Sequence, residues 1–335
     1  MSNRLTPCAI ALDQVLSRGT GLRRPECVLA TESGDLFVAH LGSGVMHIAP
    51  DGRQRAIGAV AEIEGKPWIP NGIALTRDGD FLIANMGEGG GLWRLSGRGE
   101  VTPFLRAVDG VTLTATNFVT ADRSGRLWVT VTTRQWPISK AMTAVGPHQL
   151  VDGYLFVVDE AGARIVADGF AFANEVRLNK DESEAYIVET FGRRITRFKV
   201  GPKANLSHRE IFTEFGHGVF ADGAAFDAEG CLWVASIISN RILRVAPDGG
   251  QSLILEDCNA DHVARIETLI ASGKVARDDM QRSPTELLKN VASITFAGPD
   301  LRTVYLGSLG GDRLAMLRSP VAGLPPVHWR YRARI

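Results

Sequence analysis

Oxygen-bearing side chains recur at matching places along this 335-residue sequence. Each stands eleven or twelve residues before a large side chain in a β-rich run, at Glu26, Asn71, Asn117, Asn174, Asp222 and Ser293. If these side chains come together, the two carboxylates would balance the charge of a hard divalent cation, and the neutral oxygens would complete its coordination. No His or Cys belongs to the set, which favours calcium first and magnesium second, with Mn²⁺ or Zn²⁺ as further alternatives.

A simpler interpretation competes with this metal site. Asn or Asp followed by Gly often shapes a turn, and Asn71-Gly72 and Asp222-Gly223 both have this form. Any one position alone fits either interpretation. The recurrence of an oxygen-bearing residue at every aligned position favours the shared site.

The large residues used for this alignment belong to a repeat. Turn residues followed by a short β-rich run occur at residues 33–40, 78–85, 124–131, 182–189, 229–236 and 301–308. Other β-rich runs precede and follow each of them, at roughly 45 residues per unit, which is typical of propeller blades. Single blades cannot bury both faces, so they stack around a channel. The sequence therefore predicts an all-β fold, a six-bladed β-propeller with short helical insertions, as one domain over residues 1–335.

The ends of the chain and the inner strands complete this prediction. The first strand of each blade lines the channel of a propeller, so the aligned oxygen donors should converge at one mouth. Blade 6 lacks a fourth strand of its own. Residues 11–17 are expected to supply it and so remove a free edge, with residues 327–332 as the rival segment.

Two segments exceed the repeat and are either lids over one mouth or plain surface elaborations. Residues 136–149 interrupt blade 3 between its second and third strands, and residues 256–290 separate blades 5 and 6. In the second segment, apolar residues at helical spacing predict a helix over 261–272. The sequence Ser283-Pro284 also resembles the start of a helix.

Composition narrows the classes of function. The chain has 37 basic and 37 acidic residues, a balance that argues against broad electrostatic binding to nucleic acid or to an anionic membrane. It lacks both a signal-peptide pattern and an apolar run of the ~20 residues needed to span a bilayer. The spacing of Cys8, Cys27, Cys231 and Cys258 fits neither a zinc site nor a disulfide framework. We expect a cytoplasmic protein that acts on a small molecule, with its oligomeric state left open.

Several motifs point to a known family. They are Arg24-Pro25-Glu26, Thr116-Asn117, Phe172-Ala173-Asn174, and Phe220-Ala221-Asp222-Gly223 with the following Phe226-Asp227-Ala228-Glu229-Gly230-Cys231-Leu232-Trp233. Through them the sequence resembles the regucalcin–gluconolactonase family of six-bladed propellers, also called the senescence-marker-protein family. Members are typically metal-dependent lactonases, and some relatives hydrolyse phosphotriesters. The resemblance implies Glu26, Asn174 and Asp222 as metal ligands and Asn117 as a fourth ligand or substrate contact. It also implies Asp222 as the catalytic general base.

Two positions depart from the family pattern. Ala115 stands where sugar-lactone hydrolases of the family often have Arg, which weakens the case for a gluconolactone-like substrate. Glu175 stands where they commonly have Gly, and it brings another carboxylate to the mouth or points into solvent. The stretch from Asn174 to Thr190 also resembles strictosidine-synthase-like propellers, which share the fold but not the metal chemistry.

Substrate recognition is expected from polar and aromatic side chains around the mouth. The candidates are Asn71, Asn117, Arg134, Gln135, Trp136, His148 and His217. The sequence has no G-x-S-x-G elbow and no phosphate-binding loop. We therefore predict a calcium-type hydrolase that opens a lactone ring with metal-activated water. The alternatives are a phosphotriester hydrolase on the same metal, a strictosidine-synthase-like enzyme that joins an amine to an aldehyde, and a non-catalytic ligand-binding propeller.

Overall fold

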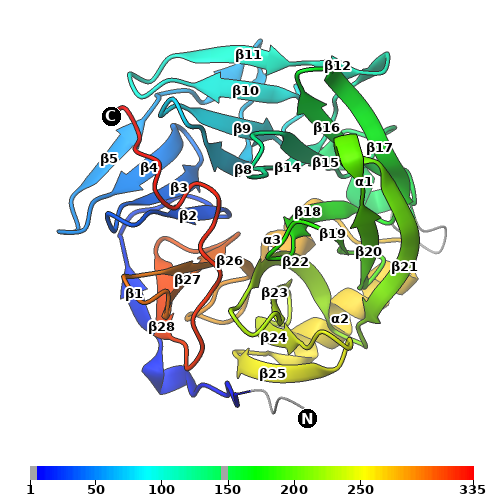
Figure 1. Ribbon diagram of the computed structural model, residues 1–335. Coiled ribbons are helices and arrows are strands. Elements are labelled where there is room, and N and C mark those ends of the chain that lie inside the picture. Colours follow the sequence, from blue (N-terminus) through cyan, green and yellow to red (C-terminus); the bar gives the residue numbers. More distant parts are fainter. Residues whose placement is uncertain (1–5, 145–149) are drawn as a thin grey trace.

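The computed structural model describes residues 6–144 and 150–335, which form six four-stranded antiparallel sheets around a central axis (Figure 1). The fold is a six-bladed β-propeller, as the repeat predicts. Blade 1 contains β2 (Val28–Ala30), β3 (Leu36–His40), β4 (Gly44–Ile48) and β5 (Gln54–Ile57). Blade 2 contains β8 (Pro70–Leu75), β9 (Phe81–Asn85), β10 (Leu92–Leu95) and β11 (Val101–Leu105). Blade 3 contains β14 (Thr116–Ala121), β15 (Leu127–Val131), β16 (Gly153–Asp159) and β17 (Gly162–Phe170).

The other three blades follow the same order from the channel to the rim. Blade 4 contains β18 (Ala173–Leu178), β19 (Glu184–Glu189), β20 (Arg194–Val200) and β21 (Leu206–Glu214). Blade 5 contains β22 (Phe220–Phe226), β23 (Leu232–Ile237), β24 (Arg241–Val245) and β25 (Gln251–Glu256). Blade 6 contains β26 (Val291–Ala297), β27 (Thr303–Ser308), β28 (Leu314–Arg318) and, at the rim, β1 (Leu16–Arg18).

The N-terminal strand closes the ring. Leu16 of β1 pairs with Met316 of β28, which confirms the expectation that residues 11–17 supply the missing strand. The rival expectation for residues 327–332 is wrong, because these residues form no strand. The C-terminal segment instead crosses one mouth of the channel (Figure 1), where the Arg334 N–H donates to the Gly79 carbonyl at 3.0 Å.

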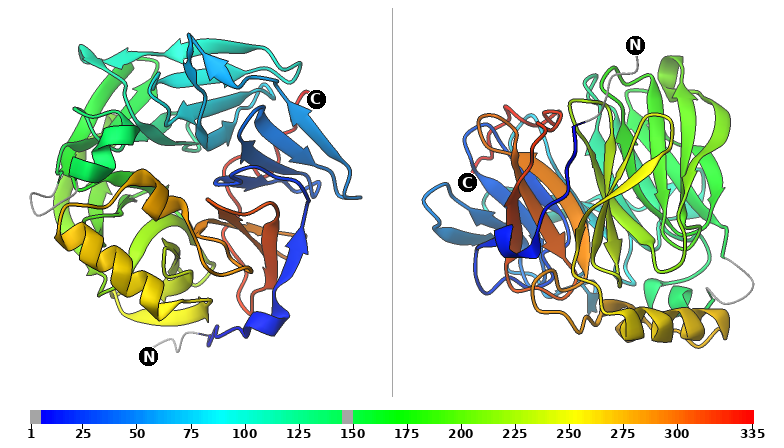
Figure 2. Two further views of the ribbon diagram at one scale, coloured as in Figure 1. Left: turned by 180° about the vertical axis from the view of Figure 1, so that it is seen from behind. Right: turned by 90° about the horizontal axis from the view of Figure 1, so that it is seen from below.

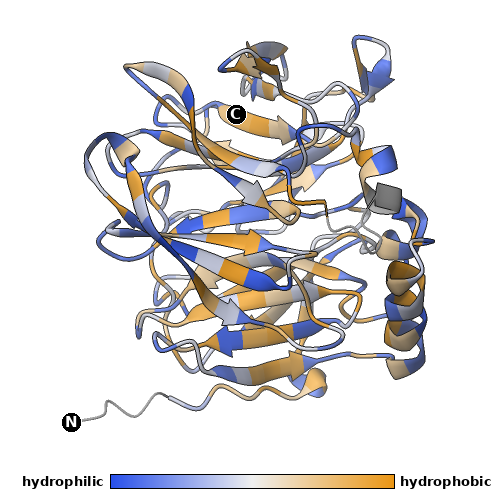
Figure 3. Ribbon diagram, turned by 90° about the vertical axis from the view of Figure 1, so that its right-hand side faces the viewer, coloured by the Kyte–Doolittle hydropathy of each residue, from blue (hydrophilic) through white to orange (hydrophobic). Residues whose placement is uncertain are grey.

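The large residues that anchor the repeat are buried within and between the blades. Trp128 and Trp233 are fully buried, and each indole N–H donates to a turn aspartate at 3.0 Å, Asp122 and Asp227 respectively. A buried indole N–H needs such a partner, so the tryptophan and the turn position each other. Figure 3 shows stretches of apolar residues along the strands, with polar residues between them.

Short elements extend the propeller outside the blades. The hairpins are β6 (Glu62–Ile63) with β7 (Lys66–Pro67) and β12 (Ala107–Val108) with β13 (Val111–Thr112); the 3₁₀ turns are η1 (Leu12–Gln14) and η2 (Pro202–Ala204). The helices are α1 (Ile138–Ala144), α2 (Ala260–Ala271) and α3 (Arg277–Gln281). None of the helices in the described ranges is long and apolar enough to cross a bilayer.

The helices confirm one expectation and correct another. Helix α2 matches the apolar spacing over 261–272, and Asn259 caps it by accepting from the His262 N–H at 2.9 Å. The expectation that a helix starts at Ser283 is wrong, because residues 282–290 are irregular. The Asn240 amide, directly before β24, donates to the hydroxyls of Ser283 and Thr285 at 3.0 and 2.8 Å. These hydrogen bonds link the irregular segment to blade 5.

Candidate metal centre

The inner strands are irregular at the positions of the aligned oxygen donors. The pairing of inner strands β8, β14, β18, β22 and β26 with their neighbours shifts register at Pro70/Ile73, Thr116/Phe118, Ala173/Val176, Ala221/Ala224 and Val291/Ser293. A bulge takes residues out of the regular pairing and re-aims their side chains. The repeat therefore encodes a recurring bulge, which presents one oxygen-bearing side chain from most blades toward the channel.

The glycines after Asn71 and Asp222 lie inside inner strands β8 and β22, so the interpretation of these pairs as turn formers is wrong. A Cβ on Gly72 would lie 2.6 Å from the Phe118 Cα, and a Cβ on Gly223 would lie 2.4 Å from the Ala292 carbonyl oxygen. Glycine is needed there because the inner strand of the next blade passes too close for any side chain. The same residues thus shape the bulge and bring adjacent blades together.

Three predicted metal ligands meet at one mouth. Glu26, Asn174 and Asp222, here called the donor set, line a small cavity of about 40 Å³. The Asn174 amide donates to the Thr190 hydroxyl at 3.0 Å, and Glu26 Oε1 accepts from Asn71 at 2.9 Å. Within the described parts of the chain, the buried Glu26 Oε2 and Asn174 Oδ1 have no hydrogen-bond partner. Buried oxygens without partners are costly, so their presence in one cavity indicates a site for a cation or a donor ligand.

The electrostatics of the donor set support this interpretation. Burial, followed by the nearby Glu175 carboxylate, raises the pKa of Asp222 to about 7, although Asn174 and Arg24 oppose the shift. Burial also raises the pKa of Glu26 well above its usual value, and Arg24 again opposes it. Burial thus disfavours the charged form of both carboxylates, and Arg24 offsets this effect only in part. The residues present therefore fit a hard divalent cation.

The donor set contains only two carboxylates. Across residues 6–144 and 150–335, no group of three or more His, Cys, Asp or Glu side chains is arranged for a metal ion. A cation in this cavity therefore depends on the neutral amide oxygen of Asn174 as well as on the carboxylates.

Asn117 and Glu175 lie beside the cavity and are engaged elsewhere. Asn117 Oδ1 accepts from the Asn71 amide at 3.0 Å, and its own amide donates to the Thr132 hydroxyl at 2.9 Å. Glu175 Oε2 accepts from Arg177 at 2.6 Å and from the Ala224 N–H at 2.9 Å. Asn117 therefore positions Asn71, while Glu175 acts on Asp222 through its charge.

Asn71 lines the cavity, as expected, and its side chain also links Arg24, Glu26 and Asn117 through hydrogen bonds. Its oxygen accepts from Arg24 at 2.7 Å, while its amide donates to Glu26 and Asn117. Arg24 also donates to the Pro70 carbonyl at 3.2 Å. The sequence interpretation used Arg24 only as part of a motif and missed it as a cavity residue. Its place two residues before Glu26 was the available signal.

The other predicted substrate contacts lie away from this cavity. Arg134 stacks on Tyr154 at 5.0 Å and pairs with Asp168 at 3.4 Å, and the Gln135 N–H donates to Asp152 at 3.0 Å. Trp136 is 38% exposed and lines no part of the cavity. The His217 side chain is 70% exposed and lies 3.7 Å from Glu267. His148 falls outside the described residues.

Both insertions cover the mouth that holds the donor set. Ile138 of α1 and Arg277, Met280 and Gln281 of α3 line the cavity. Figure 2 (left) looks onto this mouth and shows α3 lying over the opening, with α1 beside it. The sequence could not place Arg277 there, because the segment that carries it lies outside the repeat.

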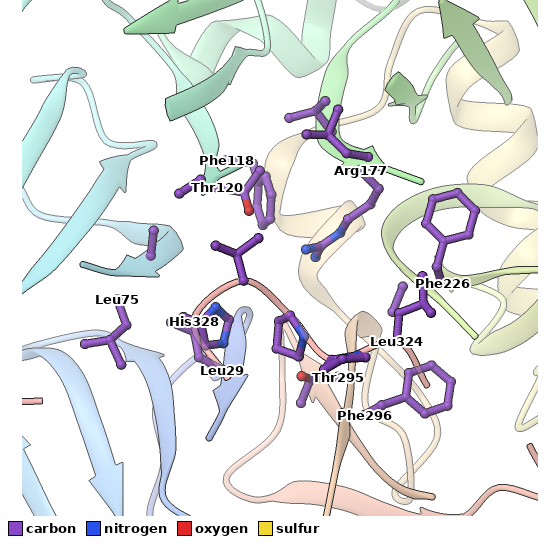
Figure 4. Close-up of a pocket in the computed structure, with 18 of the residues that line it drawn as sticks. Leu29, Leu75, Phe118, Thr120, Arg177, Phe226, Thr295, Phe296, Leu324 and His328 are labelled. Carbon is purple, nitrogen blue, oxygen red and sulfur yellow. The ribbon is translucent and has the colours of Figure 1, made fainter. Parts of the chain in front are cut away.

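The opposite mouth holds a larger cavity of about 220 Å³ (Figure 4). Arg177 lies over the Phe118 ring there at 4.5 Å, and His328 reaches in from the C-terminal segment. Ser293, the sixth aligned position, lines this second cavity instead of the first. The aligned positions therefore do not all converge, because Ser293 pairs with Gly307 and the unpaired residue of the blade 6 bulge is Ala292.

The fold is a six-bladed propeller with oxygen-bearing side chains gathered at one mouth, next to α1 and α3. Comparison with known sequences identifies its family. The profile of the SMP-30/Gluconolactonase/LRE-like region matches residues 26–266, so the chain belongs to this family. A 6-deoxy-6-sulfogluconolactonase of Pseudomonas putida is 26% identical over 245 residues, 72% of this chain and 69% of that protein. The pentonolactonase of Haloferax volcanii is 26% identical over 247 residues, 72% of this chain and 67% of that protein.

A solved structure shares the fold. The calcium-binding protein regucalcin from Agrobacterium tumefaciens superposes with a TM-score of 0.61 at 18% identity, over 95% of this chain and 94% of that one. At this identity the likeness establishes the propeller alone.

Proposed function

We propose that this protein is a divalent-metal-dependent lactonase, with calcium as the first candidate cation. The observation that carries the proposal is the convergence of the donor set in a covered mouth, with buried oxygens that lack partners. The names of the two related lactonases support a lactone as the substrate. The solved regucalcin structure is that of a calcium-binding protein, which agrees with calcium as the first candidate cation.

The donor set would hold the cation, which when bound supplies Lewis-acid polarisation of the lactone carbonyl. Asp222 would accept a proton from the water that attacks the carbonyl carbon. The ring C–O bond then breaks, and the ring oxygen takes up that proton and leaves as a hydroxyl. A bound cation would lower the pKa of Asp222 below its metal-free value of about 7, so the carboxylate would be ionised and able to accept that proton.

Helices α1 and α3, here called the lid, would exclude water and orient the substrate. Apolar side chains surround the polar floor, namely Met86, Ile138, Phe172, Phe191, Ile237, Met280 and Leu309. A cavity of about 40 Å³ is smaller than a sugar lactone, so substrate entry requires the side chains of α3 to move outward.

Hydrolysis assays with metal-stripped protein test the proposal. The panel contains sugar-derived and aliphatic lactones and one phosphotriester, with calcium, magnesium, manganese or zinc restored one at a time. We expect metal-dependent lactone turnover, and its loss in Asp222→Asn with the fold retained. Asp261→Asn, which changes an exposed aspartate on α2, is the matched control and should keep full turnover.

Each other outcome points to a specific alternative. Turnover of the phosphotriester alone would favour that chemistry on the same metal. Lactone turnover at the normal rate in Asp222→Asn would refute the role of Asp222 as base. Folded protein that hydrolyses nothing with any metal would refute the lactonase assignment.

A further inference from the structure

Two arginines face the lid-covered cavity without an ion-pair partner. Arg24 approaches from the segment before β2, and Arg277 approaches from α3. Within the described ranges, neither guanidinium lies within 4.0 Å of a carboxylate oxygen, and the buried Arg24 Nε has no hydrogen-bond partner. The carboxylates of Glu88 and Asp278 act on Arg277 from a greater distance, and both residues are exposed. Arg24 and Arg277 are here called the arginine pair.

Other arginines in the body of the propeller are neutralised directly. The ion pairs are Arg177–Glu175 at 2.6 Å, Arg194–Glu189 at 2.9 Å and Arg244–Asp227 at 2.7 Å. Burial and then the neighbouring Arg24 charge lower the pKa of Arg277 to about 10, so the two positive charges repel each other. Unpaired charges held together in a cavity indicate a missing anion.

The donor set does not supply that anion once a cation is bound. Burial lowers the pKa of Arg24 in the metal-free chain, and the nearby charges of Glu26 and Asp222 oppose this shift. A divalent cation would take up these two carboxylates, which leaves the arginine pair as excess positive charge in the cavity. Guanidinium groups bind carboxylate, sulfonate and phosphate through paired, charge-assisted hydrogen bonds.

We propose that the lactone opened by this protein carries an anionic group, a carboxylate, sulfonate or phosphate, which the arginine pair binds. This inference rests on the proposed function, because it assumes that the lactone carbonyl faces the donor set. The anionic group then lies beneath α3, next to the arginine pair. Arg277 is a specificity residue that α3 places in the cavity.

The test compares two lactones of the same ring size. D-glucaro-1,4-lactone carries a carboxylate where D-glucono-1,4-lactone carries a neutral hydroxymethyl group. We expect calcium-loaded protein to show a higher kcat/KM for the carboxylated lactone. Arg277→Met should lower that preference by about 10- to 100-fold, the usual effect of losing a hydrogen bond to a charged group. Arg277→Lys, which keeps the charge, should restore part of the preference.

Arg282→Met is the matched control, because Arg282 follows α3 directly but is exposed and outside the cavity. It should keep the preference of the unmodified protein. A second readout is independent of turnover. Sodium sulfate, compared with sodium chloride at equal ionic strength, should raise the melting temperature of the unmodified protein and Arg282→Met more than that of Arg277→Met.

The outcomes separate this inference from the proposed function. Lactone turnover with no anionic preference, or with a preference that Arg277→Met leaves unchanged, would overturn the inference and leave the lactonase assignment intact. A sulfate effect that depends on Arg277, without turnover of any lactone, would support the anion subsite and refute the lactonase assignment. The absence of both would refute both.

Discussion

Asp222→Asn should stabilise the metal-free protein at alkaline pH. Folding raises the pKa of Asp222 from 3.8 to about 7, mainly through burial. The folded chain therefore holds this proton more tightly than the unfolded chain, and stability falls as pH rises from about 4 to about 7. At about 1.4 kcal/mol per pH unit, the loss amounts to about 2 kcal/mol at pH 5 and about 4 kcal/mol at pH 8. Asparagine does not titrate and escapes this loss.

Urea denaturation in the presence of a chelator, at pH 5 and pH 8, measures the effect. The free energy of unfolding of Asp222→Asn should exceed that of the unmodified protein, and the gap should widen from pH 5 to pH 8. Asp261→Asn, exposed on α2, should show no pH-dependent gap. A variant less stable than the unmodified protein at pH 8, or a gap that does not change with pH, would show that Asp222 is a structural carboxylate. The reasoning about the donor set would then be wrong.

Two further predictions concern the scaffold. Gly72→Ala or Gly223→Ala should lower the free energy of unfolding by about 1–3 kcal/mol, because the new Cβ meets the backbone of the next blade. The control Gly216→Ala should be neutral, because its Cβ meets nothing within 4 Å. Thermal melting measures this, and equal melting of all three variants would contradict the close approach. Burial lowers the pKa of His328 from 6.5 to about 4, so the folded chain resists its protonation and stability is lost as pH falls from about 6.5 toward 4. Replacing His328 with Gln should reduce that loss by up to about 3 kcal/mol in pH-dependent melting, and an unchanged pH profile would show that His328 does not contribute to it.

The repeat made much of this structure predictable. The recurring β-rich runs placed the blades, and counting back from Trp128 and Trp233 located positions where the inner strands bulge. Counting worked because each blade repeats the same pairing, so equal spacing means an equivalent place around the channel. Glu26, Asn174 and Asp222 therefore meet as predicted.

The parts that could not be predicted lie outside the repeat or depend on contacts between blades. Arg277 belongs to an insertion whose position follows from packing against the mouth and not from any spacing. The hydrogen bond from the Asn71 amide to Asn117 Oδ1 depends on the approach of two blades. The spacing of the repeat therefore could not show that this oxygen already has a partner. Ser283-Pro284 has a local helix signal, but the segment is irregular and the Ser283 hydroxyl accepts from the Asn240 amide, a contact that local sequence does not indicate.

The central claim is that the donor set binds a divalent cation, and calorimetric titration of calcium into metal-stripped protein tests it most directly. The account predicts one site per chain in the unmodified protein and in the control Glu160→Gln, which alters an exposed glutamate outside the cavity. It predicts loss of that site in Glu26→Gln with the fold retained. Calcium binding of equal affinity in Glu26→Gln, or no binding of calcium, magnesium, manganese or zinc by the unmodified protein, would contradict it.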